Sequence, residues 1–212
     1  MRNEYLLHLL AKRRLVGLGL EENEELKRQY HGNLGEELFQ ERVLSRTWTD
    51  CVILFDLTVG GHKATQIDTL MLLADRLILV NVKYYRHENS GDFSDYYSYN
   101  VSGQLERSRH VLNYLLKREK FQLPIETAVV FVNPNLPAYH LDPREGLPDH
   151  VVQVSELDPW LEIVQNIAER SAERVRRRWP NFNFNRLLSI IDNYRIPKWY
   201  PDSYRPLERD WV

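Results

Sequence analysis

The sequence predicts an α/β fold with a mixed β-sheet in which a central antiparallel hairpin is flanked by helices. Three observations lead to this prediction. Residues 51–59 are rich in β-branched and aromatic side chains and stop at Gly60-Gly61, which is typical of a strand followed by a turn. Two further apolar runs, 65–73 and 76–84, are separated only by Ala74-Asp75, as in a hairpin with a two-residue loop. Segments with helical periodicity precede and follow these runs.

Two helices are expected before the first strand. Four leucines in a basic stretch before Gly17 indicate a short N-terminal helix, and a second helix begins near Glu21, or anew after Gly32, and runs to about residue 44. In this second helix Glu36 lies three and seven residues before apolar positions 39 and 43, whereas Glu37 points to the opposite side. Glu36 therefore borders the core, and Glu37 is expected to face water.

The second half of the chain predicts further helices and strands. The polar segment 87–100 indicates a loop or an edge strand, after which Ser102 caps a helix to about residue 117. Gln104 in the first turn of that helix points toward the sheet. Residues 126–132 are apolar throughout and predict a strand buried on both faces, and 151–154 could form another. A helix from Asp158-Pro159 to about residue 178 and a short helix over 187–191 complete the fold.

We divide the chain into an N-terminal helix (1–20), a core (21–155), and C-terminal helices with an aromatic arm packed on the core (156–212). The arm begins at Tyr194 and combines three prolines with tyrosine and tryptophan, so it is expected to be extended rather than helical. Its aromatic rings could stack on bases, but core or dimer contacts are the favoured interpretation. The arm could pack on its own domain or form a homodimer.

Composition excludes several classes of protein. With 28 basic and 30 acidic residues the net charge is −2, which excludes a large basic surface for nucleic acid. Two basic runs, 107–120 and 170–178, lie in predicted helices; such runs usually form a solvated helix face, although the first could supply local phosphate contacts. The apolar runs are far shorter than the roughly 20 residues that span a bilayer, so no membrane association is expected.

Cysteine and histidine patterns bound the compartment and the metal chemistry. Cys51 is the single cysteine, which excludes an intramolecular disulfide and fits a reducing compartment. The N-terminus lacks the pattern of a secretion signal, so a cytoplasmic location is expected. The seven histidines are scattered and have no spacing typical of a zinc site, and Cys51 itself is interpreted as a small buried hydrophobe.

The hairpin carries the polar residues that suggest chemistry. In a two-residue loop, opposed positions sum to 149, so Asp68 faces Asn81 and Gln66 faces Lys83, with all four side chains expected on one face. Polar groups there are costly unless they are satisfied. One explanation is an ion pair between Asp68 and Lys83 bridged by Asn81. The other is a site in which Asp68 and Asn81 hold a hard divalent cation through oxygen.

These residues, in this order, resemble the nuclease-related domain (NERD) family, which is grouped with the PD-(D/E)xK nucleases of restriction-endonuclease-like fold. The resemblance rests on Gly35-Glu36 in a helix, Gln66-Ile67-Asp68 in a strand, residues 77–83 in the next strand, and Gln104 in the following helix. It covers about residues 30–134.

The resemblance implies a metal-dependent phosphodiester hydrolase acting on nucleic acid, with DNA favoured over RNA as partner. It makes Asp68 a metal ligand, Glu36 a carboxylate at the site and a further ligand, Lys83 the catalytic lysine, and Gln104 a supporting residue, with Mg²⁺ or Mn²⁺ as cofactor. Lys83 would stabilise the developing charge on the phosphate.

One position departs from the family pattern. Asn81 stands where the family has an acid two residues before the lysine. An amide oxygen can coordinate Mg²⁺, but the negative charge is lost. The alternative function is therefore a catalytically degenerate module that binds nucleic acid or another protein, while Glu36 could supply the missing charge in an active enzyme.

Overall fold

The central feature of the fold is a single five-stranded sheet. The computed structural model describes residues 4–60, 64–84, 93–135 and 148–196. Strand order is β1-β2-β3-β4-β5; β1, β2 and β3 are antiparallel, and β3, β4 and β5 are parallel. The sheet is therefore mixed, as predicted. The strands are β1 (Cys51–Gly60), β2 (Ala64–Leu73), β3 (Leu77–Lys83), β4 (Ile125–Phe131) and β5 (His150–Gln153).

The hairpin between β2 and β3 has the predicted register. Thr69 pairs with Val80 and Leu72 with Leu77, so paired positions sum to 149. The backbone N–H of Leu73 donates to the carbonyl of Arg76 at 2.9 Å, which closes the loop of Ala74 and Asp75. A two-residue loop leaves no freedom to slip, because a shift of one residue would turn every side chain to the wrong face.

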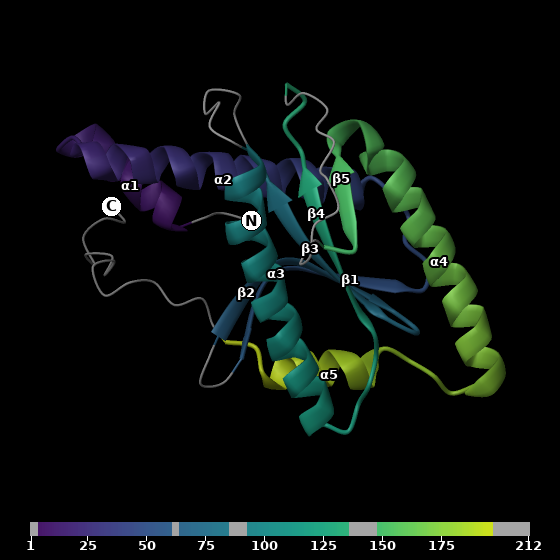
Figure 1. Ribbon diagram of the computed structural model, residues 1–212. Helices are drawn as coiled ribbons and strands as arrows, with labels where there is room; N and C mark the ends of the chain where they lie inside the picture. Colours follow the sequence, from purple (N-terminus) through teal and green to yellow (C-terminus); the bar gives the residue numbers. More distant parts are fainter. Residues whose placement is uncertain (1–3, 61–63, 85–92, 136–147, 197–212) are drawn as a thin grey trace.

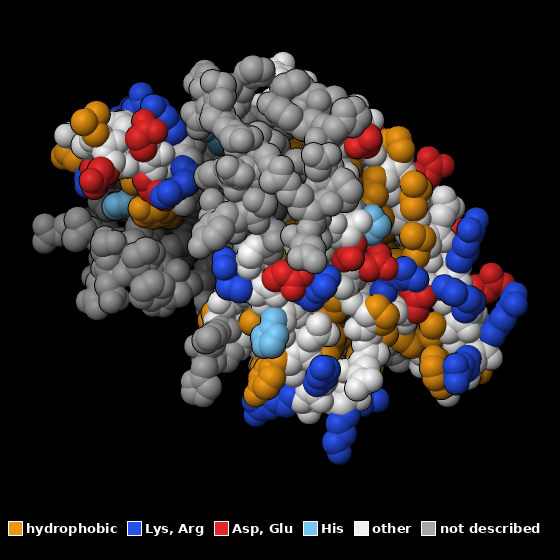
Figure 2. Space-filling model, in the orientation of Figure 1, with side chains coloured by type: hydrophobic (Ala, Val, Ile, Leu, Met, Phe, Trp, Pro, Cys, Tyr) orange, Lys and Arg blue, Asp and Glu red, His pale blue; other side chains and the backbone are white. Residues whose placement is uncertain are grey.

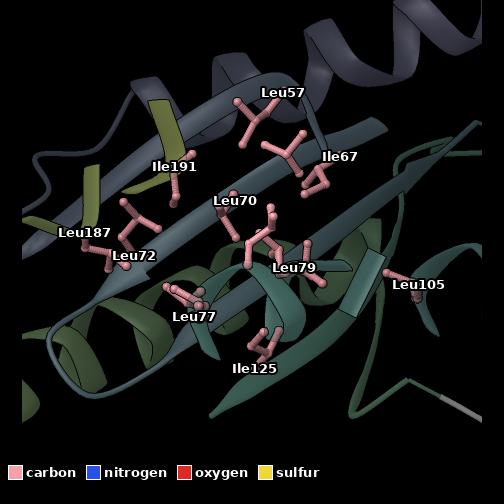
Figure 3. Close-up of a cluster of buried hydrophobic side chains, with 14 of the residues drawn as sticks. Leu57, Ile67, Leu70, Leu72, Leu77, Leu79, Leu105, Ile125, Leu187 and Ile191 are labelled. Carbon is pink, nitrogen blue, oxygen red and sulfur yellow. The ribbon is translucent and has the colours of Figure 1, made fainter. Parts of the chain in front are cut away.

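Helices cover both faces of the sheet (Figure 1). One face packs against α3 and α5 through a cluster that includes Leu70, Leu79, Leu105 and Ile191 (Figure 3). The other packs against α2 and α4 through Phe39, Val80 and Leu161. The helices are α1 (Glu4–Leu15), α2 (Leu20–Leu44), α3 (Phe93–Arg118), α4 (Leu157–Arg178) and α5 (Asn185–Asn193), with a 3₁₀ turn, η1 (Val154–Glu156), before α4.

Two helix predictions need correction or completion. The structure has one continuous helix α2, so Gly32 does not interrupt it. Helix α3 begins at Phe93, so the prediction of a loop or edge strand over 87–100 is wrong from that residue on. Ser102 lies inside the helix rather than at its cap. Residues 87–92 lie outside the described chain. Extending an existing helix costs much less than nucleating one, so the packed half of α3 can carry weak helix formers before it.

The first helix of the described chain packs on α2, whereas the last described residues pair with strand β1. Helix α1 packs on α2 through Leu6, Leu9 and Leu26. After α5, Ile196 donates to the carbonyl of Thr58 at 2.9 Å and Tyr194 accepts from Gly60 at 3.1 Å, so the chain pairs with the outer edge of β1. The predicted aromatic arm beyond residue 196, and any dimer through it, lie outside the described residues. No helix of the described chain is long and apolar enough to cross a membrane.

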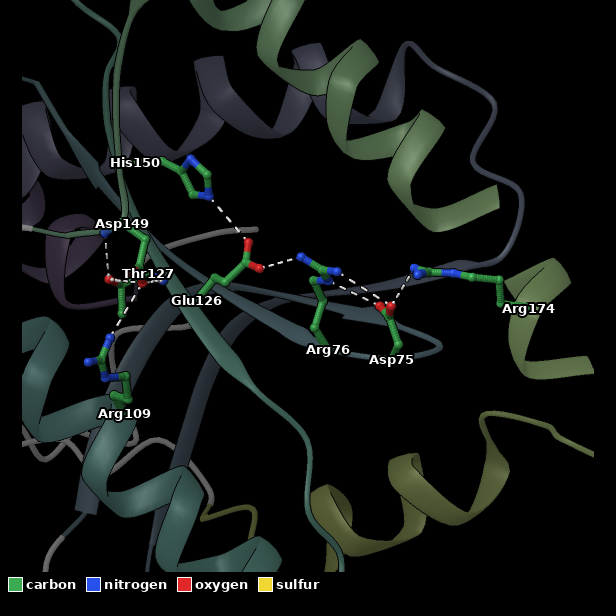
Figure 4. A network of polar contacts seen from close by, with 8 residues as sticks. All are labelled: Asp75, Arg76, Arg109, Glu126, Thr127, Asp149, His150 and Arg174. Carbon is green, nitrogen blue, oxygen red and sulfur yellow. Dashed lines mark hydrogen bonds and ion pairs between the residues drawn. The ribbon is translucent and has the colours of Figure 1, made fainter. Parts of the chain in front are cut away.

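A chain of ion pairs connects the hairpin loop to β4 and β5 at one end of the sheet (Figure 4). Arg76 pairs with Asp75 at 3.1 Å and also with Glu126 of β4, and Glu126 contacts His150 at 3.2 Å. Arg174 of α4 reaches Asp75 at 2.9 Å. These contacts tie together the end of the sheet that lies away from Lys83.

Candidate active site

The backbone pairing between β2 and β3 stops at Asp68, which leaves an opening between the two strands. Their backbone pairing extends only from the loop to Thr69 and Val80, although both strands continue past this point. Beyond it, the backbone N–H of Val82 donates to Asp68 Oδ2 at 2.8 Å. A carboxylate thus takes the place of a backbone carbonyl, and polar side chains can reach the opening between the strands.

The regular alternation of side chains breaks at this opening. Ile67 belongs to the same core cluster as Leu70 and Leu72, which a strict period of two would place on opposite faces. The neighbouring strand β1 is irregular at the same place. Its pairing with β2 skips Asp56 and Asp68, and Asp56 has a left-handed φ of 49°. Both strands therefore change the face of their side chains around these two acids.

This break changes which predicted residues come together. Thr65 contacts Ser108 of α3 at 2.7 Å, so Gln66, its neighbour in the strand, points to the other face and donates to Asp56 Oδ1 at 3.3 Å. The prediction that Gln66 shares a face with Lys83 is therefore wrong. It assumed uniform alternation along β2, which buried acids at positions 56 and 68 do not allow.

Carboxylates from three elements line one small pocket that opens to solvent between α2 and the sheet. Glu36 comes from α2, Asp56 from β1 and Asp68 from β2. Glu37 is exposed, as predicted, but it also lines this pocket, and Asn33 donates to its carboxylate at 2.7 Å. The opposite placement expected for Glu37 is therefore wrong. The remaining lining residues are Asn33, Gln40, Phe55 and Thr69.

Gly35 positions Glu36 because it allows α2 to approach the end of β3 closely. A Cβ atom at position 35 would lie 3.0 Å from Tyr84 Cβ and 3.4 Å from Val132 Cγ2. Real Cβ atoms rarely come so close to a neighbour. The Gly-Glu pair that supports the family resemblance thus has a structural reason: glycine allows the contact, and the next residue reaches the pocket.

Lys83 and Asn81 project from β3 on the side of α3. Lys83 Nζ donates to Gln104 Oε1 at 3.4 Å, so the structure brings together this predicted pair. Asn81 is 4% exposed, and its Oδ1 is buried without a hydrogen-bond partner among the described residues. A buried oxygen left unsatisfied costs roughly 1–3 kcal/mol. The site therefore contains an acceptor that the described polypeptide does not use.

Electrostatics at the opening favour a proton or a cation. Withdrawal from water raises the pKa of Asp68, and the nearby charge of Asp56 adds to this, whereas Lys83 and the Val82 N–H act in the opposite direction. Asp68 and Lys83 interact through their charges, but the described residues include no ion pair between them. The simpler explanation of the polar cluster, a direct pair bridged by Asn81, is therefore not what these residues form.

The oxygen donors fit a hard divalent cation in chemical type. Glu36, Asp56 and Asp68 share a pocket on the side of α2. Asn81 does not line that pocket but lies on the side of α3, where its amide oxygen has no partner among the described residues. Within the described ranges, no three acidic, histidine or cysteine side chains converge tightly enough to form a complete ligand set. Mg²⁺ usually takes one or two protein carboxylates and keeps several waters, so an incomplete protein set is compatible with it.

The two basic runs do not form a continuous basic surface. In Figure 2, acidic side chains lie among the lysines and arginines of α3 and α4. Arg174 and Arg176 of α4 pair with Asp75 and Asp50, and Arg109 of α3 pairs with Asp149 at 3.4 Å. These arginines serve internal contacts, as expected for a solvated helix face.

Sequence reasoning missed Asp56 as a site residue. It is 9% exposed and lines the pocket beside Asp68. The signal was present, because Asp56 is the one acid inside the apolar run of β1, and acids are rarely buried without a reason. Its proximity to Asp68 depends on strand pairing over twelve positions and could not be read from either strand alone.

The architecture and these side chains define an α/β domain of nuclease-like fold. Residues 31–132 match the NERD family, the nuclease-related domain, and we therefore assign this part of the chain to that family. The matched segment contains Glu36, Asp68, Asn81, Lys83 and Gln104. Neither the curated proteins nor the solved structures gave a match to the chain.

Proposed function

We propose that this domain hydrolyses phosphodiester bonds of nucleic acid in a reaction that depends on Mg²⁺ or Mn²⁺, with DNA favoured as substrate. The observation that carries the proposal is the buried Oδ1 of Asn81, which has no partner among the described residues and lies two residues before Lys83. An amide oxygen in this state is stabilised by a cation or by a donor that arrives with the substrate.

Asp68 and Glu36, which line the same pocket, would hold the divalent ion through oxygen, and Asn81 would supply an amide oxygen from the α3 side of the opening beside Asp68. When bound, the ion supplies positive charge that polarises the scissile phosphate and makes an attacking water more acidic. The carboxylates of Asp56 and Asp68 reinforce this preference, because two neighbouring acids repel each other until a cation or a proton neutralises them.

Lys83 would place its ammonium group where negative charge develops on the phosphate. Gln104 accepts a hydrogen bond from Lys83 Nζ at 3.4 Å, which directs the flexible lysine side chain without neutralising it. Lys83 forms no ion pair with Asp68 among the described residues, so its ammonium group would be able to contact the substrate directly. Oriented charge of this kind is usually the largest contribution to catalysis.

A cleavage assay tests the proposal. Purified protein is incubated with labelled DNA and RNA in Mg²⁺, in Mn²⁺ and in EDTA, beside Lys83→Ala and Lys27→Ala. Lys27 is a control because it is an exposed lysine of α2 that pairs with Glu24 of the same helix and does not line the pocket. We expect metal-dependent cleavage that Lys83→Ala abolishes and Lys27→Ala retains. Equal cleavage by all three proteins identifies a contaminant and contradicts the proposal.

The replacement of an acid by Asn81 supports a second candidate, a degenerate module that binds nucleic acid or a protein without hydrolysis. The variant Asn81→Glu separates the two. Restoring the charge should create cleavage in a protein that has none if the module is degenerate, and should change an existing rate only moderately if Glu36 already supplies the charge.

A further inference from the structure

A ladder of three rings, formed by Tyr30, His31 and Tyr84, lies beside the candidate site. The rings of His31 and Tyr84 are nearly parallel, with 8° between their planes and 5.7 Å between centroids. Tyr30 meets His31 edge-on at 75° with the same separation. The ladder therefore joins α2 to the residue that follows β3.

The ladder is adjacent to the residues that we assign to hydrolysis. Tyr84 directly follows Lys83 in the chain, although its ring packs on the α2 face of the sheet whereas Lys83 reaches Gln104 of α3. His31 precedes Gly35 by one helical turn, and Gly35 contacts Tyr84 and precedes Glu36. The aromatic rings thus lie at the same end of the sheet as the pocket and the catalytic lysine.

The ladder is also accessible. Tyr30 is 51% exposed, and both His31 and Tyr84 are only partly buried. Rings whose sole task is to fix a helix to a strand are usually covered, because burial of aromatic surface is what stabilises such a contact. An aromatic surface beside a phosphate site offers a stacking partner for a base.

We propose that Tyr30, with His31 and Tyr84, stacks against an unpaired base next to the scissile phosphate, so that the site takes single-stranded or frayed nucleic acid. This inference rests on the proposed function for its substrate class. A base within a duplex is already covered by its neighbours on both faces, so it cannot stack on a side chain unless it leaves the helix. Stacking also tolerates any base, because each has a π-face.

The test measures binding rather than hydrolysis. Fluorescence anisotropy is recorded with a labelled single-stranded oligonucleotide and with the duplex of the same sequence, both in Ca²⁺ and in EDTA. The proteins are the native chain, Tyr30→Ala, Tyr30→Phe and Tyr114→Ala. Tyr114 is a matched control because it is a tyrosine 59% exposed on α3, away from the ladder.

We expect Tyr30→Ala to weaken binding of the single strand by roughly 5- to 100-fold, and Tyr30→Phe and Tyr114→Ala to bind like the native chain. The duplex should bind more weakly than the single strand and should be insensitive to Tyr30→Ala. Tighter binding of the duplex, or equal single-strand affinity of Tyr30→Ala and Tyr114→Ala, overturns the inference.

The outcomes separate this inference from the proposed hydrolysis. Tyr30-dependent binding by a protein that cleaves nothing supports the stacking surface and contradicts hydrolysis. Cleavage that depends on Lys83, with binding independent of Tyr30, supports hydrolysis and contradicts the stacking surface.

Discussion

Replacing Gly35 by alanine should loosen the contact that places Glu36 in the pocket, and Gly32 provides the matched control. Both glycines lie inside α2. An added Cβ at position 35 would lie 3.0 Å from Tyr84 Cβ, whereas one at position 32 would meet nothing within 4 Å. The two substitutions therefore make the same change to one helix and differ only in what the new methyl group contacts.

The magnitude follows from two opposing effects. Glycine in a helix interior is about 1 kcal/mol less favourable than alanine, so Gly32→Ala should raise the free energy of unfolding by about that amount. Gly35→Ala gains the same contribution but crowds Tyr84 and Val132, and overpacking of this kind costs roughly 1–3 kcal/mol. The two variants should therefore differ by roughly 1–3 kcal/mol, with Gly35→Ala the less stable.

Urea unfolding followed by circular dichroism measures this difference, with Tm from calorimetry as a second readout. For a chain of this size 1 kcal/mol corresponds to roughly 2–4 °C in Tm. Cleavage should fall in Gly35→Ala and persist in Gly32→Ala, because only the first moves Glu36. Equal stabilisation by the two substitutions would refute the close contact between α2 and β3.

Three further predictions concern charges and the thiol. Asp68→Asn should raise Tm by a few degrees at neutral pH, because the fold holds the pKa of this acid above its usual range; a loss of stability would contradict this explanation. The same variant should abolish metal binding measured by calorimetry, because it lacks the carboxylate ligand. Asp149 is withdrawn from water, but hydrogen bonds from Thr127 and Arg109 more than offset this and lower its pKa. Its folded-state pKa lies below the unfolded one, so its stabilisation, which partial exposure to solvent reduces, is present above the unfolded pKa and is lost as pH falls through the folded pKa. The stability difference between the native chain and Asp149→Asn should therefore shrink on acidification, and a constant difference would exclude a role for the charge. Burial raises the pKa of the Cys51 thiol to about 12, so alkylation at pH 8 should be much slower than for an exposed cysteine; rapid labelling of the folded protein would exclude this environment.

The hairpin and the buried strands could be predicted because their signals are local. Ala74-Asp75 between two apolar runs sets the loop length, and the loop length sets the register, which the structure confirms from Thr69 to Leu72. The apolar run of β4 likewise predicted a strand covered on both sides. Helix α3 was harder, because its first residues are weak helix formers and their state depends on the packed turns that follow.

The candidate site could be predicted only in part. The order of Glu36, Asp68, Lys83 and Gln104 along the chain was enough to suggest the family, and residues 31–132 match it. Asp56 and Gln66 were misjudged, because a period of two holds only while the backbone stays regular, and Asp56 adopts a left-handed φ of 49°. A local break of this kind has no dependable signature in the apolar pattern.

The sequence by itself determined the α/β class, the register of the hairpin and the set of polar residues that needed an explanation. Each of these follows from contacts between positions close in the chain, or from the cost of placing a polar side chain on an apolar strand. Only the tertiary structure decided that β2 and β3 separate at Asp68, that Asp56 joins the pocket, and that His31 of α2 stacks on Tyr84. These features depend on distant segments packing against each other, and the side chains that meet there are set by the whole sheet rather than by any one strand.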